Sequence, residues 1–190
     1  MAVDKRTLLL DAAEAVLVQQ GLVGATIDQI TSRAGVAKGT FYLYFRSKDE
    51  VIGALQERLW DGLVAASLEA AARMEGDDWW DVIDSFLETV VDYDLGHRDW
   101  HRLVAQGWSS PGSDVSQRER QIVEVIADRI KVGLDKGLFE VPDVGLTATL
   151  LYRACSGTMH EYCVSDAPID RDEVLTTMKW FVRRVLQPTP

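Results

Sequence analysis

The 190-residue sequence predicts an all-α protein. Apolar residues recur every three or four positions along most of the chain, and no segment shows the alternating pattern of a β-strand. Breaks that contain glycine or proline divide this pattern into segments of helical length. Some segments also begin with a capping box, in which a hydroxyl and the residue three positions later cap free backbone amides. Together these features predict helices throughout.

Helix boundaries near the N-terminus follow from capping residues. Gly21 is expected to end a first helix, and Thr26 with Gln29 opens a short second helix that ends at Gly35. A short aromatic third helix follows, and Ser47 opens a long fourth helix that reaches roughly residue 74. Five further helices are expected over roughly 78–95, 98–108, 113–137, 143–164 and 171–187.

Charge is distributed unevenly along the chain. The net charge is −10, yet residues 1–55 hold six of the 20 Lys and Arg residues and six of the 30 acidic residues, so this segment is neutral. Residues 56–190 hold the other 14 basic and 24 acidic side chains and carry the whole excess. An acidic chain is unsuited to indiscriminate binding of nucleic acid, and the asymmetry predicts two parts with different partners.

Several features indicate the compartment. Cys155 and Cys163 lie on one expected helix, which separates their Cα atoms by roughly 12 Å, beyond the reach of a disulfide. We expect buried free thiols in a reducing compartment. No apolar run is long enough for a membrane-spanning helix, and Asp11 and Glu14 interrupt the N-terminal run that a signal peptide requires. A cytoplasmic location is therefore expected.

The second and third helices are joined by a short glycine-containing turn at residues 34–37. This arrangement matches a helix-turn-helix, whose second helix can enter the major groove of DNA. Phe41 and Phe45 are four positions apart, so they point to the same side of the third helix. We expect both phenylalanines to anchor the helix in the core.

The other side of the third helix carries groups that suit DNA. Thr40 and Leu43 can contact a base edge or a thymine methyl group, and the hydroxyls of Tyr42 and Tyr44 can donate to phosphates. Lys48 joins the free amides at the start of the fourth helix in a potential phosphate site. Alternatively, the outward tyrosines are ordinary surface residues. The expected DNA-binding residues are Thr26, Lys38, Gly39, Thr40, Tyr42, Leu43, Tyr44 and Lys48.

Residues from about 9 to 52 resemble the DNA-binding region of the TetR family of bacterial transcriptional regulators, over about a quarter of the chain. Two positions depart from the family pattern. Thr31 replaces a small alanine, and Ala37 replaces a serine that would cap the third helix, a loss of roughly 1 kcal/mol. The matching residues are Ala12-Ala13, Gly21, Thr26, Ile30, residues 34–45 (AGVAKGTFYLYF) and Ser47-Lys48-Asp49.

The resemblance implies a function and a domain organisation. Residues 1–46 would form a three-helix DNA-binding domain, and residues 47–190 a larger helical domain for ligand sensing and dimerisation, with the helix from 47 to about 74 linking the two. The protein would bind a near-palindromic operator as a homodimer and act as a repressor that a small lipophilic ligand releases. We expect no enzymatic activity, no cofactor and no membrane association.

The resemblance also places a ligand pocket among the middle helices. Aromatic and apolar side chains there suit a lipophilic ligand, although each of them can equally fill a core. Within the long fourth helix, Gly53 and Gly62 mark either bending points or sites of close packing. The candidate lining residues are Phe86, Val90, Tyr93, Trp100, Trp108, Ile126, Tyr152 and Met159.

The last two helices are the dimer face that the resemblance implies, with an intramolecular core as the alternative. Two such helices from each subunit can form a four-helix bundle. One expected stripe is Leu146, Leu150, Leu151, Ala154 and Thr158, and the other is Val174, Met178, Phe181, Val185 and Leu186.

Two other classes of function remain open from the residues alone. The first is a small all-α enzyme or metal-binding protein centred on His97 and His101, which share a helical face and have Asp94 and Asp99 nearby. The second is a protein-interaction module whose helix-turn-helix docks a protein. Such a module would lack the steep salt dependence of phosphate contacts.

Overall fold

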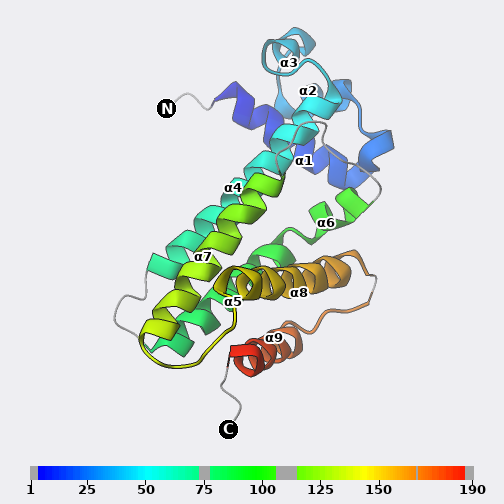
Figure 1. Ribbon diagram of the computed structural model, residues 1–190. Coiled ribbons are helices and arrows are strands. Elements are labelled where there is room, and N and C mark those ends of the chain that lie inside the picture. The colour runs from blue at the N-terminus through cyan, green and yellow to red at the C-terminus, as the bar shows by residue number, and fades with distance from the viewer. Residues whose placement is uncertain (1–3, 73–77, 106–114, 166, 187–190) are drawn as a thin grey trace. The chain divides into compact units, whose positions relative to one another are not determined.

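The structure is a computed structural model that describes residues 4–72, 78–105, 115–165 and 167–186 (Figure 1). Across these ranges it contains nine α-helices and no strand, so the predicted all-α fold class is confirmed. The chain divides into two compact units. The first contains the residues up to Trp60 together with 99–113, and the second contains 61–98 and the residues from 114 onward.

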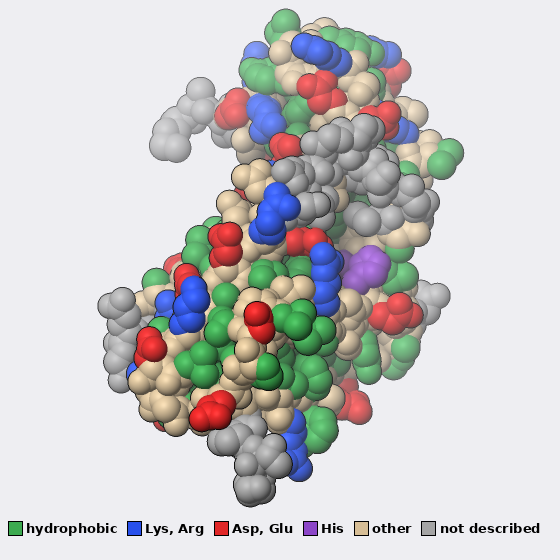
Figure 2. All heavy atoms as spheres, viewed as in Figure 1, with side chains coloured by type: hydrophobic (Ala, Val, Ile, Leu, Met, Phe, Trp, Pro, Cys, Tyr) green, Lys and Arg blue, Asp and Glu red, His purple; other side chains and the backbone are tan. Residues whose placement is uncertain are grey.

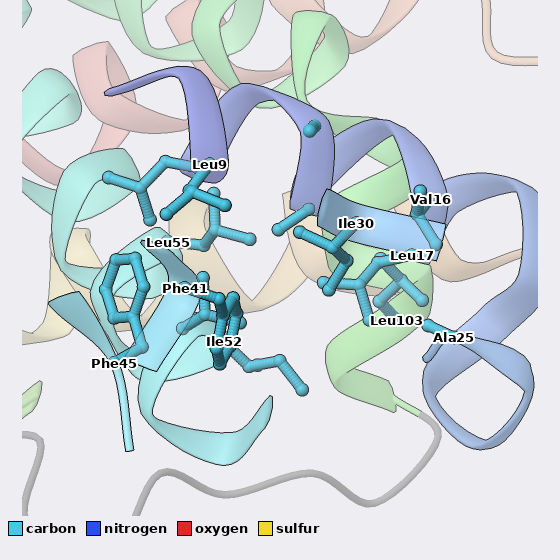
Figure 3. Packing of buried hydrophobic residues seen from close by; sticks show 14 residues of the cluster. Leu9, Val16, Leu17, Ala25, Ile30, Phe41, Phe45, Ile52, Leu55 and Leu103 are labelled. Carbon is cyan, nitrogen blue, oxygen red and sulfur yellow. The ribbon is translucent and has the colours of Figure 1, made fainter. Parts of the chain in front are cut away.

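The first unit is built from α1 (Lys5–Gly24), α2 (Ile27–Ala34), α3 (Lys38–Tyr44), the beginning of α4 (Lys48–Ala72) and most of α6 (Arg98–Ala105). Its core draws an apolar residue from each helix (Figure 3). Phe41 is fully buried and Phe45 is 2% exposed, which confirms both as core anchors. The other residues labelled in this core are Leu9, Val16 and Leu17 of α1, Ala25 after it, Ile30 of α2, Ile52 and Leu55 of α4, and Leu103 of α6.

The second unit contains the end of α4, α5 (Trp79–Gly96), α7 (Val115–Asp135), α8 (Val144–Val164) and α9 (Arg171–Leu186). In this unit α7 packs along α8, and α5 packs against both α8 and α9. Trp79 lies at the centre, with its ring centroid 4.9 Å from that of Phe139 and its Nε1 donating to the Arg129 carbonyl at 2.8 Å. The aromatic residues of this unit therefore contribute to a packed core.

Helix boundaries agree closely with the capping residues. Helix α1 is broken at Gly21, where φ is 70° and ψ is 174°. Ser47 Oγ accepts from the Glu50 amide at 3.1 Å, but the Glu50 carboxylate accepts from the Arg46 amide, so only half of the expected capping box forms. The expected ends of the helices near residues 74, 108 and 113 lie outside the described residues.

Part of the acidic excess is used in ion pairs between α5 and α9. Carboxylates spaced four residues apart on α5 meet cations spaced along the antiparallel α9. The Arg171 guanidinium holds the pKa of Asp92 below its ordinary value. The exposed pair at Asp92 contributes little to stability, whereas the pairs at Asp84 and Glu88 are partly buried, and together the three align the two helices. The pairs are Asp84–Arg183 at 2.8 Å, Glu88–Lys179 at 2.7 Å and Asp92–Arg171.

Both Cys155 and Cys163 are free thiols, as their separation predicts, but only Cys163 belongs to the fully buried residues. Cys163 is fully buried, and burial raises the pKa of Cys155 to about 11. No helix in the described ranges combines the length and apolar character needed to cross a membrane.

Gly62 is a site of close packing between α4 and α5. A Cβ atom at this position would lie 2.4 Å from Tyr93 Oη and 3.2 Å from Tyr93 Cζ. No real side chain tolerates the shorter distance, so glycine lets the tyrosine ring reach the α4 backbone. This contact settles the role of Gly62, which the sequence left open.

We predict that Gly62→Ala lowers the unfolding free energy by about 1–2 kcal/mol, because overpacking outweighs the better helix propensity of alanine. In a Tyr93→Phe background the same substitution should cost less, since the nearest atom has been removed. Urea denaturation of the four chains measures both costs. Equal costs in the two backgrounds would contradict this explanation.

Candidate nucleic-acid interface

The turn between α2 and α3 is defined by caps on both sides. Thr26 Oγ1 accepts from the Gln29 amide at 3.3 Å and the Gln29 side chain accepts from the Thr26 amide at 2.9 Å, so the predicted capping box is complete. Gly35 ends α2 at φ 66°, a left-handed conformation that glycine adopts without strain. The Val36 amide then donates to the Thr31 carbonyl at 3.1 Å, which closes the turn.

The start of α3 lacks a side-chain cap. Ala37 occupies the N-cap position with extended backbone angles, and its methyl group accepts no hydrogen bond. Thr31, the other departure from the family pattern, is buried at 4% exposure, with its hydroxyl donating to the Ile27 carbonyl at 3.0 Å. The extra hydroxyl is therefore satisfied within its own helix.

Helix α3 presents a continuous outward face opposite its phenylalanine anchors. Leu43 is 81% exposed, Tyr42 is 51% exposed and Tyr44 is 37% exposed, while Thr40 is half-buried between them. Lys38 and Gly39 are exposed at the beginning of the helix. A leucine with this exposure contributes almost nothing to the packing of the chain itself. The structure thus brings together six of the eight predicted DNA-binding residues on one short helix.

Lys38 is engaged in an ion pair at the tip of this face. Its Nζ lies 2.6 Å from Asp28 Oδ1 in the first turn of α2. The hydrogen bond and the negative charge of Asp28 raise the pKa of Lys38. In Figure 2, basic and acidic side chains accordingly lie next to each other over α2 and α3. The sequence reading had not singled out Asp28.

Lys48 has an internal role that the sequence did not reveal. Its Nζ donates to the Leu22 carbonyl at 2.6 Å and to the Ala25 carbonyl at 3.0 Å. It therefore ties the start of α4 to the segment that precedes Thr26, the cap of α2. An ammonium group has three donors, so one remains for a phosphate.

We predict that Lys48→Met lowers the unfolding free energy by about 1–3 kcal/mol, because two partly buried carbonyls lose a charged donor while the aliphatic volume is kept. Lys5→Met, at an exposed position of α1, provides a control for the lost charge. Denaturation monitored by circular dichroism compares both variants with wild type. If the two variants were equally stable, the two carbonyl contacts would not support the fold.

The predicted ligand-binding residues occupy different environments. In the second unit, Phe86 and Tyr152 are buried, Met159 lies in the core, and Val90, Tyr93 and Ile126 are half-buried. Trp100 packs against the core of the first unit, and Trp108 lies outside the described residues.

Two buried hydroxyls in the second unit stand out. Ser67 Oγ, in a residue that is 1% exposed, has no hydrogen-bond partner among the described residues. The Tyr152 hydroxyl makes no well-formed hydrogen bond to them either, and burial raises the pKa of Tyr152 while nearby Ser156 offsets only part of that rise. No pattern in the sequence marked Ser67.

The histidine pair received no structural support as a metal site. His97 Nδ1 lies 2.7 Å from the Tyr93 carbonyl, and its ring stacks on that of Tyr93 at a centroid distance of 4.2 Å. Among the described residues, no group of three His, Cys, Asp or Glu side chains is arranged to hold a metal ion.

Helices α8 and α9 carry a second exposed apolar surface, and hydrophobic side chains are visible over them in Figure 2. Leu146 and Leu150 are each 60% exposed on α8, and Trp180 is 59% exposed on α9. The stripe expected on α9 needs correction, because its members Val174, Met178 and Leu186 are buried in the core of the second unit, as is Leu151 of α8. The outward face of α9 carries Val185, a member of the expected stripe, and Trp180, which was not in it.

Comparison with known proteins adds independent observations. Residues 9–55 match the family model described as bacterial regulatory proteins, tetR family. The HTH-type transcriptional regulator YvdT of Bacillus subtilis is 38% identical over 92 residues, which span 48% of this chain and 46% of that relative. The Bacillus subtilis regulator YhgD is 22% identical over 187 residues, or 96% of each chain.

Solved structures resemble the fold as a whole. The fatty acid degradation regulator FadR from Bacillus halodurans superposes with a TM-score of 0.72 over 96% of each chain, at 19% identity. A TetR-family regulator from Thermus thermophilus, PfmR, gives the same TM-score over 93% of this chain and 97% of its own, at 22% identity. At these identities the likeness concerns the fold.

Proposed function

We propose that this chain is a transcriptional regulator of the tetR family, and specifically a repressor that binds a near-palindromic DNA operator as a homodimer. The exposed face of α3 is the observation that carries this proposal. It displays a leucine, two tyrosines and a threonine on a helix that Phe41 and Phe45 hold from behind. We assign DNA binding to residues 1–46 together with Lys48 at the start of the next helix, and ligand binding and dimerisation to residues 47–190, and we place the protein in the cytoplasm.

On DNA, the outward groups of α3 would divide into two classes. Thr40 and Leu43 contact base edges or thymine methyl groups in the major groove and thereby select the sequence. The hydroxyls of Tyr42 and Tyr44, together with the Lys48 ammonium, donate to phosphates and set the position of the helix. Gly39 allows the DNA backbone to approach the start of α3.

We predict different outcomes for the two classes when binding to an operator and its single-base variants is titrated. Thr40→Val and Leu43→Ala should change the ranking of the variants, by about tenfold at one position in each half-site. Tyr42→Phe removes only a hydroxyl and should weaken binding to all sequences alike. If Thr40→Val and Leu43→Ala also acted alike on every sequence, their role as base readers would be refuted.

The dimer would form through the outward faces of α8 and α9. Leu146, Leu150, Trp180 and Val185 give these helices an apolar surface that a second copy can cover in a four-helix bundle. Ala154 and Gly157 are exposed on α8 as well, and such small side chains permit close helix approach. In a two-fold symmetric dimer, each of these residues lies in the interface twice, once from each copy of the chain.

We predict that Leu150→Asp raises the dimer dissociation constant by about 100-fold or more, because two leucines lose their burial and two carboxylates replace them. Leu68→Asp, at a site on α4 that is 50% exposed, provides the matched control and should leave the dimer intact. Analytical ultracentrifugation over a concentration series measures both. A Leu150→Asp chain as dimeric as the Leu68→Asp chain would refute this surface.

A small lipophilic ligand would release the operator by shifting the population of dimer conformations. A ligand can shift this equilibrium only by its differential affinity for the two states. The candidate contacts are Phe86, Val90, Tyr93, Ile126, Tyr152 and Met159, with the hydroxyls of Ser67 and Tyr152 as polar groups. Helix α4 begins in the first unit and ends in the second, so it is the element through which we propose that the shift is transmitted.

This ligand proposal is tested by screening lipophilic compounds for release of a fluorescent operator. Compounds that release DNA should also raise the melting temperature of the DNA-free protein, because they bind the folded chain. Tyr152→Phe should weaken the response to compounds that carry a hydrogen-bonding group. Release without any binding to the DNA-free protein would contradict the mechanism.

A further inference from the structure

We propose that Asp28 and Lys38 act together as a reader of one G·C base pair in each operator half-site. Lys38 would donate to N7 and O6 of guanine, and Asp28 would accept from the exocyclic amino group of the paired cytosine. This inference rests on the proposed DNA-binding function. It adds the Asp28 carboxylate to the groups that read bases. Without a base contact, a carboxylate near DNA phosphates is unfavourable.

The geometry joins two helices at the edge of the proposed DNA-binding face. Asp28 is the second residue of α2 and Lys38 is the first residue of α3, and their charged atoms are 2.6 Å apart. Both side chains remain accessible, with exposed fractions of 71% and 54%. The pair therefore presents one acceptor and one donor side by side, next to the outward residues of α3.

An acidic residue in the first turn of α2 and an exposed ion pair each contribute only a little to folding. Helix α2 is already capped by the complete box of Thr26 and Gln29, so the Asp28 side chain is not needed as a cap. Exposed ion pairs contribute little to stability because water and salt screen them. A carboxylate that also faced phosphates would weaken DNA binding, unless it met a donor on a base.

The G·C base pair offers a matching set of groups in the major groove. Guanine has two neighbouring acceptors, N7 and O6, and the cytosine amino group is the adjoining donor. The guanine O6 and the cytosine amino nitrogen are hydrogen-bonded to each other at about 2.9 Å, close to the separation of the two protein groups. Lys38 can thus take both acceptors while Asp28 takes the donor.

An A·T pair fits less well. Its amino donor lies between its two acceptors, the adenine N7 and the thymine O4, so Lys38 could reach only one acceptor while Asp28 occupied the donor. The two-residue unit therefore prefers G·C, whereas either residue alone would discriminate weakly.

The test begins with selection of bound sequences from a random DNA pool by wild type, followed by titration of the selected operator and its single-base variants. The variants are Asp28→Ala and Lys38→Met. Asp49→Ala is the matched control, because Asp49 is also exposed and also the second residue of its helix. Removing either carboxylate also removes charge repulsion from the DNA phosphates, so the measured quantity is base preference and not affinity.

Wild type should select an operator with one G·C pair per half-site that Asp28→Ala and Lys38→Met each cease to prefer, with discrimination there falling about tenfold. Asp49→Ala should keep that preference, and thermal melting should show that all chains are folded. If both pair variants kept every base preference of wild type, the reading unit would be refuted while DNA binding stood. If wild type selected no sequence, the proposed function itself would fail, and this inference with it.

Discussion

The burial of Phe41 and Phe45 is the constraint on which the exposed face of α3 depends. A helix of seven residues is too short to be stable by itself. The two rings lie in the core of the first unit with their centroids 5.7 Å apart, and this packing fixes the rotation of α3 about its axis. Because one side is held in this way, Leu43 and the two tyrosines must face outward.

The supports of α3 come from several parts of the first unit. The capping box fixes where α2 begins, the left-handed Gly35 fixes where it ends, and the core beneath the phenylalanines holds α3 in place. Lys48 adds a link between the start of α4 and the carbonyls of Leu22 and Ala25. Since Ala37 gives α3 no cap of its own, its order depends on these neighbours.

The sequence predicted the features that depend on local spacing. The interval between Phe41 and Phe45, the capping pair of Thr26 and Gln29, and the glycine at position 35 each specify a local structure, and all three are present. The partner of Lys38 lies on another helix, and the carbonyls that Lys48 binds lie at the end of α1, so no spacing rule marks them. The spacing of residues predicts contacts within one helix but not contacts between residues of different segments.

The exposed surface of α9 could not be predicted from the sequence for the same reason. Apolar residues occur on more than one side of it, so periodicity alone did not distinguish Val174 and Met178, which are buried, from Trp180, which is exposed. Likewise, Gly62 was ambiguous until Tyr93 was found against it. Tertiary contacts decide which apolar residues enter the core and which remain exposed.

The most direct test of the central claim is to select bound sequences from a random DNA pool, at moderate salt, with wild type and a Lys38→Ala/Tyr44→Ala variant side by side. The account predicts that wild type enriches a near-palindromic sequence and that the folded variant does not. Enrichment of the same palindrome by the variant would show that the outward face of α3 is not what reads the DNA.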